Sequence, residues 1–230
     1  MNDIFVYPLQ NSKEYKDIIN CINNNKGSLL INGLLAVQKP HIAYSMYRDL
    51  NRQTIFITNS DLEAKKVYDD LSFYMKDKVE YIGFQDILFY HLDAKDRSEE
   101  AKRLKVLLKL AKGENIILVT SIEAVMRKYI PKEILLENIY TYKIGDVINL
   151  EKLSETLVNL GYERVSKIEG FGQFSIRGGI VDIFSLEYNN PIRMELFDDE
   201  IDSIRTFDVF SQKSIEKINK FSITPSREFI

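Results

Sequence analysis

The second half of the chain contains closely spaced strand patterns in residues 161–210, which read GYERVSKIEGFGQFSIRGGIVDIFSLEYNNPIRMELFDDEIDSIRTFDVF. Apolar and polar residues alternate in short segments, and pairs such as Gly178-Gly179 stand where turns are needed. The segments that this pattern predicts as strands are 164–168, 173–176, 180–184, 192–197 and 201–207. Asp198-Asp199-Glu200 would connect the last two strands as a short polar turn. Such spacing predicts an antiparallel meander, preceded by one helix at roughly residues 150–160.

The first half alternates helical and strand periodicity instead. Tyr15, Ile18 and Ile22 have the spacing of one helix face, and Ser60 with Glu63 forms a capping box for a later helix. Helices are predicted after Ser12, at 40–50, after Ser60 and from about Ser98 to Ala111, and strands at 28–31, 54–58, 79–82 and 116–119. Strands that alternate with helices need crossover connections, so this half predicts an α/β domain with a parallel sheet. The change of pattern near Pro131 predicts a first domain of residues 1–130 and a smaller α+β domain of residues 131–217.

Composition and charge exclude several classes of protein. The chain has 230 residues, with 31 Lys and Arg against 34 Asp and Glu, so its formal net charge is −3. Because nucleic-acid backbones are bound by clustered Lys and Arg, this balance argues against nucleic-acid binding as the main task. Cys21 is the sole cysteine, so no internal disulfide can form, and with two histidines it cannot complete a usual zinc site. The start lacks a signal-peptide pattern and no apolar run reaches ~18 residues, so we expect no membrane partner and a cytoplasmic location.

Residues 33–40, GLLAVQKP, partly match a phosphate-binding P-loop. A P-loop follows a strand, has the pattern G-x-x-x-x-G-K-[ST], and precedes a helix. Gly33 and Lys39 are in register, but Gln38 replaces the second glycine and Pro40 replaces the hydroxyl that would hold magnesium. The loop therefore predicts a plain turn between strand and helix, or a nucleotide site that has lost its function.

Other candidates for chemistry are weaker. Residues 194–200 end an apolar strand in acids, as magnesium-binding strands do, but Glu195 interrupts the strand and a hairpin turn is the preferred interpretation. His41 and His91 have no serine or cysteine partner placed by a motif, so we expect both to be structural or solvated. Cys21 beside an apolar helix face is most simply a packed residue. We therefore predict no catalytic residue, no metal and no cofactor.

Residues 161–210 closely resemble the second domain that the bacterial transcription-repair coupling factors, the Mfd family, share with the excision-repair protein UvrB. The motifs of that family occur in order as Gly172–Gly179 (GQFSIRGG), Val181–Phe184 (VDIF), Arg193–Arg205 (RMELFDDEIDSIR) and Ser211–Ser214 (SQKS). The end of the chain, residues 218–230, resembles the strand by which this family returns toward its first domain. Weaker similarity upstream, at residues 86–103, follows the Mfd version of the first domain.

The resemblance implies a function for each half. It implies that the first domain is RecA-like and has lost its nucleotide site, in agreement with Gln38 and Pro40. It implies that the second domain docks onto UvrA, the damage-recognition ATPase. The family's polymerase-binding and DNA-translocating motor domains would lie beyond Ile230, so contacts with RNA polymerase and double-stranded DNA would be made by domains absent here.

Four residues are candidates for the docking surface. Arg164 and Arg177 lie on neighbouring predicted strands, and a guanidinium suits carboxylates on a partner. Phe174 and Phe184 could be apolar anchors, although alternation also allows Phe174 to be core. Asp182 could pair with an arginine internally or contact the partner.

Two functions stay open from the sequence. The leading one is a protein-interaction module of DNA repair without catalysis. The alternative is a nucleotide- or DNA-binding domain of a helicase-like ATPase that uses Gly33–Lys39 and Asp198–Glu200.

Overall fold

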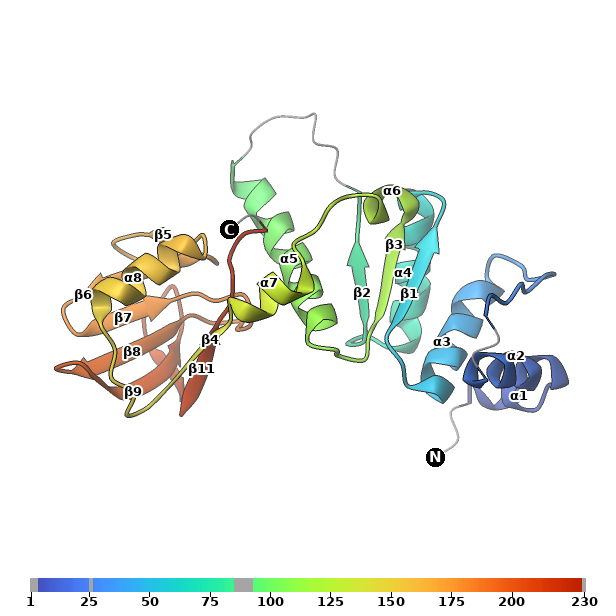
Figure 1. Cartoon of the computed structure of the whole chain (residues 1–230), viewed down its shortest axis with the longest axis horizontal. Coiled ribbons are helices and arrows are strands. Elements are labelled where there is room, and N and C mark those ends of the chain that lie inside the picture. The colour runs from blue at the N-terminus through green and yellow to red at the C-terminus, as the bar shows by residue number, and fades with distance from the viewer. Residues whose placement is uncertain (1–3, 25–26, 85–92, 229–230) are drawn as a thin grey trace. The chain divides into compact units, whose positions relative to one another are not determined.

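The computed structural model describes residues 4–24, 27–84 and 93–228, and of residues 93–98 it describes the backbone alone. The chain divides into two compact units, and each is described by itself. The first unit contains residues 1–89 and 113–128, and the second contains residues 90–112 and 129–230. The fold is mixed α/β, with one parallel sheet and two sheets that contain antiparallel pairs (Figure 1).

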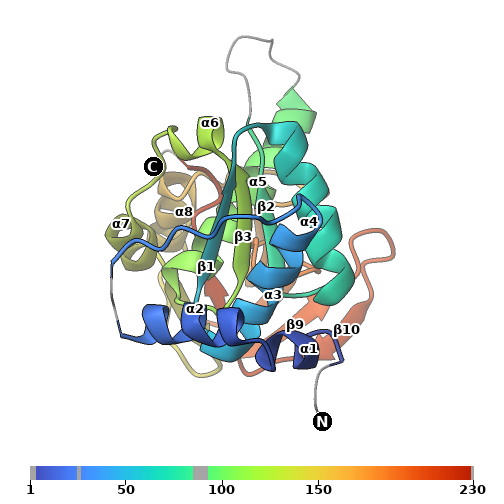
Figure 2. The same ribbon diagram turned by 90° about the vertical axis from the view of Figure 1, so that its right-hand side faces the viewer.

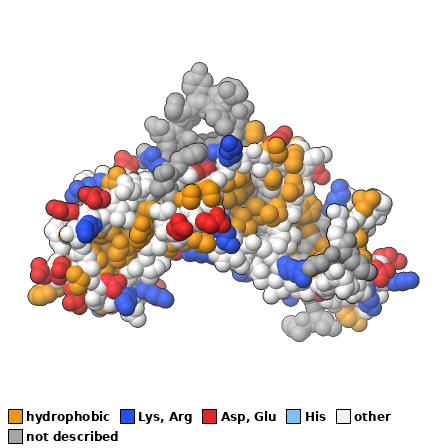
Figure 3. Space-filling view, in the orientation of Figure 1, with side chains coloured by type: hydrophobic (Ala, Val, Ile, Leu, Met, Phe, Trp, Pro, Cys, Tyr) orange, Lys and Arg blue, Asp and Glu red, His pale blue; other side chains and the backbone are white. Residues whose placement is uncertain are grey.

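The first unit is built around a three-stranded parallel sheet of order β1-β3-β2. Its elements are α1 (Tyr7–Gln10), α2 (Lys13–Asn23), α3 (Gln38–Leu50), β1 (Thr54–Thr58), α4 (Asp61–Tyr74), β2 (Val79–Ile82), β3 (Ile117–Ser121) and α6 (Ile122–Val125). Helices α3 and α4 lie beside the strands of this sheet (Figure 2). Their residues Tyr44, Val67 and Leu71 share one apolar core with Ile117 and Val119 of the central strand. Alternate residues of β1, Ile55 and Ile57, remain exposed, and apolar side chains gather over this part of the first unit in Figure 3.

The second unit combines a six-stranded sheet with helix α8 on its apolar side and with two further helices, α5 and α7, that form a separate apolar cluster. Its elements are α5 (Asp93–Ala111), α7 (Lys132–Glu137), β4 (Tyr140–Lys143), α8 (Leu150–Asn159), β5 (Glu163–Arg164), β6 (Gln173–Arg177), β7 (Ile180–Ile183), β8 (Ile192–Phe197), β9 (Glu200–Phe207), β10 (Ser214–Lys217) and β11 (Lys220–Ile223). The order of the large sheet is β10-β9-β8-β7-β6-β5, and β11 pairs with β4 in a separate two-stranded sheet. Leu153 and Leu157 of α8 pack on Phe174, Val181 and Met194 of the large sheet, because alternate residues of each strand point to this side.

The chain after β11 is fixed against the rest of the second unit. Ser226 N donates to Leu160 O at 2.8 Å, and the buried hydroxyl of Tyr162 donates to Thr224 O at 2.8 Å. Burial raises the pKa of Tyr162 to about 12, so the hydroxyl keeps the proton that it donates. Gly161 adopts φ +85°, and a Cβ there would lie 2.9 Å from Arg227 Cγ, so this close approach of two segments requires glycine.

Helix α5 belongs to the second unit. Leu104, Leu108 and Ala111 share a core with Leu135 of α7 and with Leu186. Arg103 forms a buried ion pair with Glu228, and Lys112 pairs with Glu187. These contacts join a helix from the first half of the sequence to the strand-rich second half.

Most of the predicted elements are present. Strands β1, β2 and β8 have the predicted bounds, and Ser60 Oγ accepts a hydrogen bond from Glu63 N, as expected for the cap of α4. The predicted strand 28–31 is wrong: these residues form no strand and Leu30 is exposed. The meander is antiparallel from β6 to β10, but β5 pairs with β6 in parallel, because the chain between them passes through residues 165–172 instead of a tight hairpin.

Candidate docking surface

The side of the six-stranded sheet that faces away from α8 carries charged side chains. We call it the polar face and define it by Ser175, Arg177, Asp182, Arg193, Glu195 and Arg205. These residues alternate along their strands with the apolar residues of the core, so each strand has one apolar side and one polar side. Ser175, Asp182, Arg193 and Arg205 are register partners from strand to strand, which places them in one row across β6, β7, β8 and β9.

Asp182 is at the centre of this row and is only 2% exposed. Its Oδ1 accepts from Arg193 Nε at 2.6 Å, and its Oδ2 accepts from Arg193 Nη2 at 2.8 Å and from Arg177 Nη2 at 2.7 Å. Arg193 is fixed further, since Nη2 donates to Gln212 Oε1 at 3.0 Å and the guanidinium lies 4.2 Å from the ring centroid of Phe207. One carboxylate thus holds two guanidinium groups from the two neighbouring strands.

A second ion pair lies beside this cluster. Arg205 Nη1 donates to Glu195 Oε2 at 2.8 Å, Arg205 Nη2 pairs with the other carboxylate oxygen, and Ser203 Oγ donates to Oε2 at 3.1 Å. Hydrogen bonding from Arg205 lowers the pKa of Glu195, and the same contact raises the pKa of Arg205. Glu195 and Arg205 therefore neutralise each other, whereas Asp182 with Arg177 and Arg193 leaves an excess positive charge on the polar face.

Two aromatic rings lie in contact at the end of β7. The ring centroids of Phe171 and Phe184 are 4.2 Å apart, and the planes are tilted by 42°. Phe184 N donates to Gln173 O and Phe184 O accepts from Gly172 N, so Phe184 continues the pairing of β7 with β6. Phe184 is 6% exposed but Phe171 is 50% exposed, so the ring available to a partner is that of Phe171.

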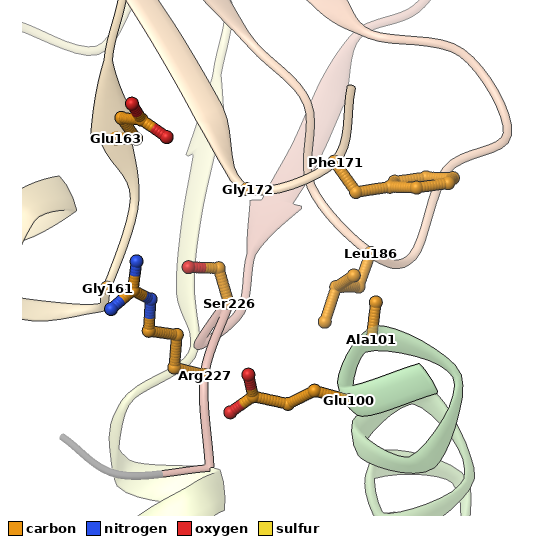
Figure 4. A pocket seen from close by; sticks show the side chains of 9 residues that line it. All are labelled: Glu100, Ala101, Gly161, Glu163, Phe171, Gly172, Leu186, Ser226 and Arg227. Atoms are coloured by element: carbon orange, nitrogen blue, oxygen red, sulfur yellow. The ribbon is translucent and has the colours of Figure 1, made fainter. Parts of the chain in front are cut away.

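A small pocket opens beside Phe171 (Figure 4). Its volume is about 30 Å³, and its lining is Glu100, Ala101, Gly161, Glu163, Phe171, Gly172, Leu186, Ser226 and Arg227. Figure 4 shows Phe171, Leu186 and Ala101 on one side of it, with Glu163 and Arg227 on the other. A space of this size holds about one water molecule, so it is no site for a nucleotide or a cofactor.

The four predicted docking residues lie in different environments. Arg177 is on the polar face with its side chain 49% exposed. Arg164 is exposed on the edge strand β5, but its register partner is Phe174, so it belongs to the opposite side of the sheet. Phe174 is fully buried in the apolar core, and Phe184 is covered by Phe171. The structure therefore brings Arg177 and Phe184 to one side of the sheet and leaves Phe174 without exposed surface.

Phe171 is the residue that the sequence reasoning missed. It lies in the irregular segment between β5 and β6, where strand alternation gives no information on exposure. The available signal was its place between Gly170 and Gly172, because closely spaced glycines indicate a loop.

The loop of residues 33–40 has no P-loop geometry. The described residues 27–32 directly before it form no strand, and helix α3 begins at Gln38, so Gln38, Lys39 and Pro40 form the first turn of that helix. Gln38 Oε1 accepts from Leu35 N at 2.9 Å. One of the backbone N–H groups that a phosphate would need is thus already bonded to the residue that replaces the P-loop glycine.

The remaining candidates have structural contacts. His41 Nε2 lies 2.7 Å from Phe5 O, and its ring stacks on Tyr74, while His91 is outside the described residues. Asp198 and Asp199 form the two-residue turn between β8 and β9, with φ +59° at Asp198. Cys21 is a partly buried free thiol.

The described residues contain no group of three or more His, Cys, Asp or Glu side chains placed to hold a metal ion. In the same part of the chain, no helix has the length and apolar character that a membrane crossing requires.

Comparison with protein families matches residues 141–229 to the family described as "UvrB interaction domain". This range contains the whole six-stranded sheet, the polar face and the Phe171–Phe184 pair. The second half of the chain is thus similar to an interaction domain.

Comparison with curated proteins finds transcription-repair-coupling factors. The chain is 33% identical over 223 residues to that of Bacillus subtilis (strain 168), a match that covers 96% of this chain and 19% of the relative. It is 33% identical over 204 residues to that of Staphylococcus epidermidis, covering 88% of this chain and 17% of the relative, and 30% identical over 223 residues to that of Staphylococcus haemolyticus, covering 96% and 19%. The resemblance to the Mfd family is confirmed, and the chain spans about a fifth of the length of these relatives.

Proposed function

We propose that this chain is a non-catalytic protein-interaction module of transcription-coupled nucleotide excision repair and that its second unit docks onto UvrA. The observation that carries the proposal is the match of residues 141–229 to the UvrB interaction domain within a chain that is 33% identical to a coupling factor along 96% of its length.

The polar face supplies the chemistry that such docking needs. Arg177 offers a half-exposed guanidinium that is already held on one side by Asp182, and Phe171 adds an exposed ring on the same side of the sheet. Guanidinium and aromatic groups dominate the binding energy of many interfaces, and a guanidinium pairs well with carboxylates. We propose Arg177 and Phe171 as the docking residues, with Phe184 as the support beneath Phe171. Arg164 would contact UvrA only if UvrA also reaches the edge strand β5.

For the first unit, we propose a RecA-like domain whose nucleotide site has lost its function. Support comes from the bond between Gln38 and Leu35 N and from Pro40, which has no N–H for a phosphate. The domain division that we propose along the sequence is residues 1–130, residues 131–217 and a return segment of residues 218–230. In this division α5 belongs to the first domain by sequence, while it packs with residues of the second unit. Contacts with RNA polymerase and double-stranded DNA, and ATP-driven translocation, would belong to other parts of the full-length protein, which we place in the cytoplasm.

The alternative of a nucleotide- or DNA-binding ATPase domain has less support. Its two parts, Gly33–Lys39 and Asp198–Glu200, are a helix start whose N–H group is occupied and a hairpin turn. The first belongs to the first unit and the second to the second unit.

Calorimetric titration of the chain into UvrA from the same organism tests the proposal. Saturable binding that weakens as salt is raised is expected, because the polar face has an excess positive charge and such interfaces are screened by ions. Absence of binding to UvrA, together with a melting transition that Mg-ATP raises, would favour the ATPase alternative instead.

A further inference from the structure

We infer that Asp182 is a positioning residue of the docking surface, which orients Arg177 toward a carboxylate of the partner. This inference rests on the proposed function, because it assigns the residue that prepares the same surface for binding. Asp182 itself is too deeply buried to touch a partner, so its effect on docking must pass through the arginines that it holds.

Arg193 alone satisfies the buried carboxylate. It donates one N–H to each oxygen of Asp182, the two-point arrangement in which a guanidinium and a carboxylate pair best. Arg193 is itself mostly buried, with its side chain 13% exposed, and it is also bonded to Gln212 and stacked on Phe207. The Arg193–Asp182 pair is therefore complete without Arg177.

Arg177 is not needed to compensate the buried charge of Asp182, because Arg193 already bonds both carboxylate oxygens. Arg177 donates to Asp182 through Nη2 at 2.7 Å, and none of its other guanidinium N–H groups donates to another of the described residues. A guanidinium has five N–H donors in one plane, so a single bond to a fixed oxygen restricts the plane while leaving several donors for another acceptor. An arginine on an exposed strand position would otherwise sample many rotamers, and ordering it in advance lowers the entropic cost of binding.

The charge of the cluster selects the partner group. Asp182 contributes one negative charge and Arg177 and Arg193 two positive charges, so the cluster attracts an anion. Because the exposed part is a planar guanidinium, the matching group is the planar, two-oxygen carboxylate of an aspartate or glutamate. The neighbouring Glu195–Arg205 pair is neutral and offers no comparable excess charge.

A double-mutant cycle tests the inference with the whole 230-residue chain and UvrA. Arg177→Ala is expected to weaken binding about 30-fold and Asp182→Asn about 10-fold, whereas the double variant should bind like Arg177→Ala to within about 2-fold. Glu155→Gln is the matched control, since it also neutralises one carboxylate of the second unit but lies exposed on α8, which covers the opposite side of the sheet. This control should change affinity by less than about 2-fold in both backgrounds.

The inference is overturned if Asp182→Asn weakens binding equally with and without Arg177, since its effect would then be structural. The same holds if Glu155→Gln shows the same coupling to Arg177. If Asp182→Asn does not fold, Asp182→Glu replaces it, because it keeps the charge and displaces the carboxylate.

A second measurement needs no partner. In the free protein, nitrogen-15 relaxation of Arg177 Nε should report an ordered side chain, which becomes mobile in Asp182→Asn. A side chain that is equally mobile in both proteins contradicts the inference even if UvrA binding fails. Loss of UvrA binding with an ordered Arg177 would instead contradict the proposed function alone.

Discussion

Truncation of Phe174 and of Phe171 should separate core from docking surface. Phe174 is fully buried between β6, β7 and α8, so Phe174→Ala removes a ring from a region that is packed on every side. Core Phe→Ala substitutions cost about 3–5 kcal/mol, because the lost transfer free energy is joined by the cost of the cavity. At ~4 °C for each kcal/mol in a unit of this size, the melting temperature should fall by about 12–20 °C.

Phe171→Ala is the matched variant. Half of this side chain is already exposed and its main aromatic contact is Phe184, so the expected cost is about 1 kcal/mol and ~4 °C. Urea unfolding followed by circular dichroism gives both free energies, and titration with UvrA gives the affinities. Phe171→Ala should lose UvrA affinity while it stays folded. A Phe174→Ala protein as stable as the wild type, or one whose loss is matched by Phe171→Ala, would refute this assignment of the two rings.

Three further predictions concern other parts of the molecule. Mg-ATP at millimolar concentration should leave the melting transition unchanged, because Gln38 occupies Leu35 N and Pro40 lacks an N–H; a stabilisation of about 2 kcal/mol would contradict this. Because Arg205 lowers the pKa of Glu195, this pair stabilises the folded state above the ordinary glutamate pKa of about 4.3 and loses that effect as pH falls through the lowered value. The stability difference between the wild type and Arg205→Ala should therefore shrink at low pH in urea titrations, and a constant difference would exclude the pair as its source. Arg103→Ala should lower the free energy of unfolding by about 3 kcal/mol in the same assay, because it leaves Glu228 buried without this partner. Lys102→Ala, at an exposed position, should lower it by less than about 0.5 kcal/mol. Equal losses in the two variants would contradict the importance of the buried pair.

The sequence predicted those elements whose signals are local. Strand β1 is rich in β-branched residues and ends in turn residues, and α4 begins with the cap formed by Ser60 and Glu63, so both have the expected positions. The segment 28–31 was mistaken for a strand because a short apolar run is also compatible with an extended segment that pairs with nothing.

The docking surface was only partly predictable, because it depends on strand register. Alternation along β6 correctly predicts that the side chains of Arg177 and Phe174 point to opposite sides of the sheet. The side on which Arg164 lies follows from the parallel pairing of β5 with β6, which the sequence does not reveal. The bond between Arg177 and Asp182 could be suspected from their spacing around a hairpin. The second partner, Arg193, comes from the next strand and needs the register of β7 with β8.

The packing partner of α5 could not be predicted from the sequence either. Its apolar stripe predicted an amphipathic helix with one buried face, but the periodicity of one helix does not identify the surface that this face covers. Leu104 and Leu108 in fact pack with Leu135 and Leu186 of the second unit, and the buried Arg103–Glu228 pair joins residues that are 125 positions apart. Long-range contacts of this kind are set by the whole fold.

The central claim is that the chain docks onto UvrA through the polar face, and the affinity of Arg177→Ala for UvrA tests it most directly. Arg52→Ala is the control, since Arg52 is an exposed arginine of the first unit and its removal changes the net charge equally. At one ionic strength, Arg177→Ala should bind UvrA about 30-fold more weakly than the wild type, with an unchanged melting transition, and Arg52→Ala should bind like the wild type. Equal affinities of Arg177→Ala and the wild type for UvrA would contradict the claim.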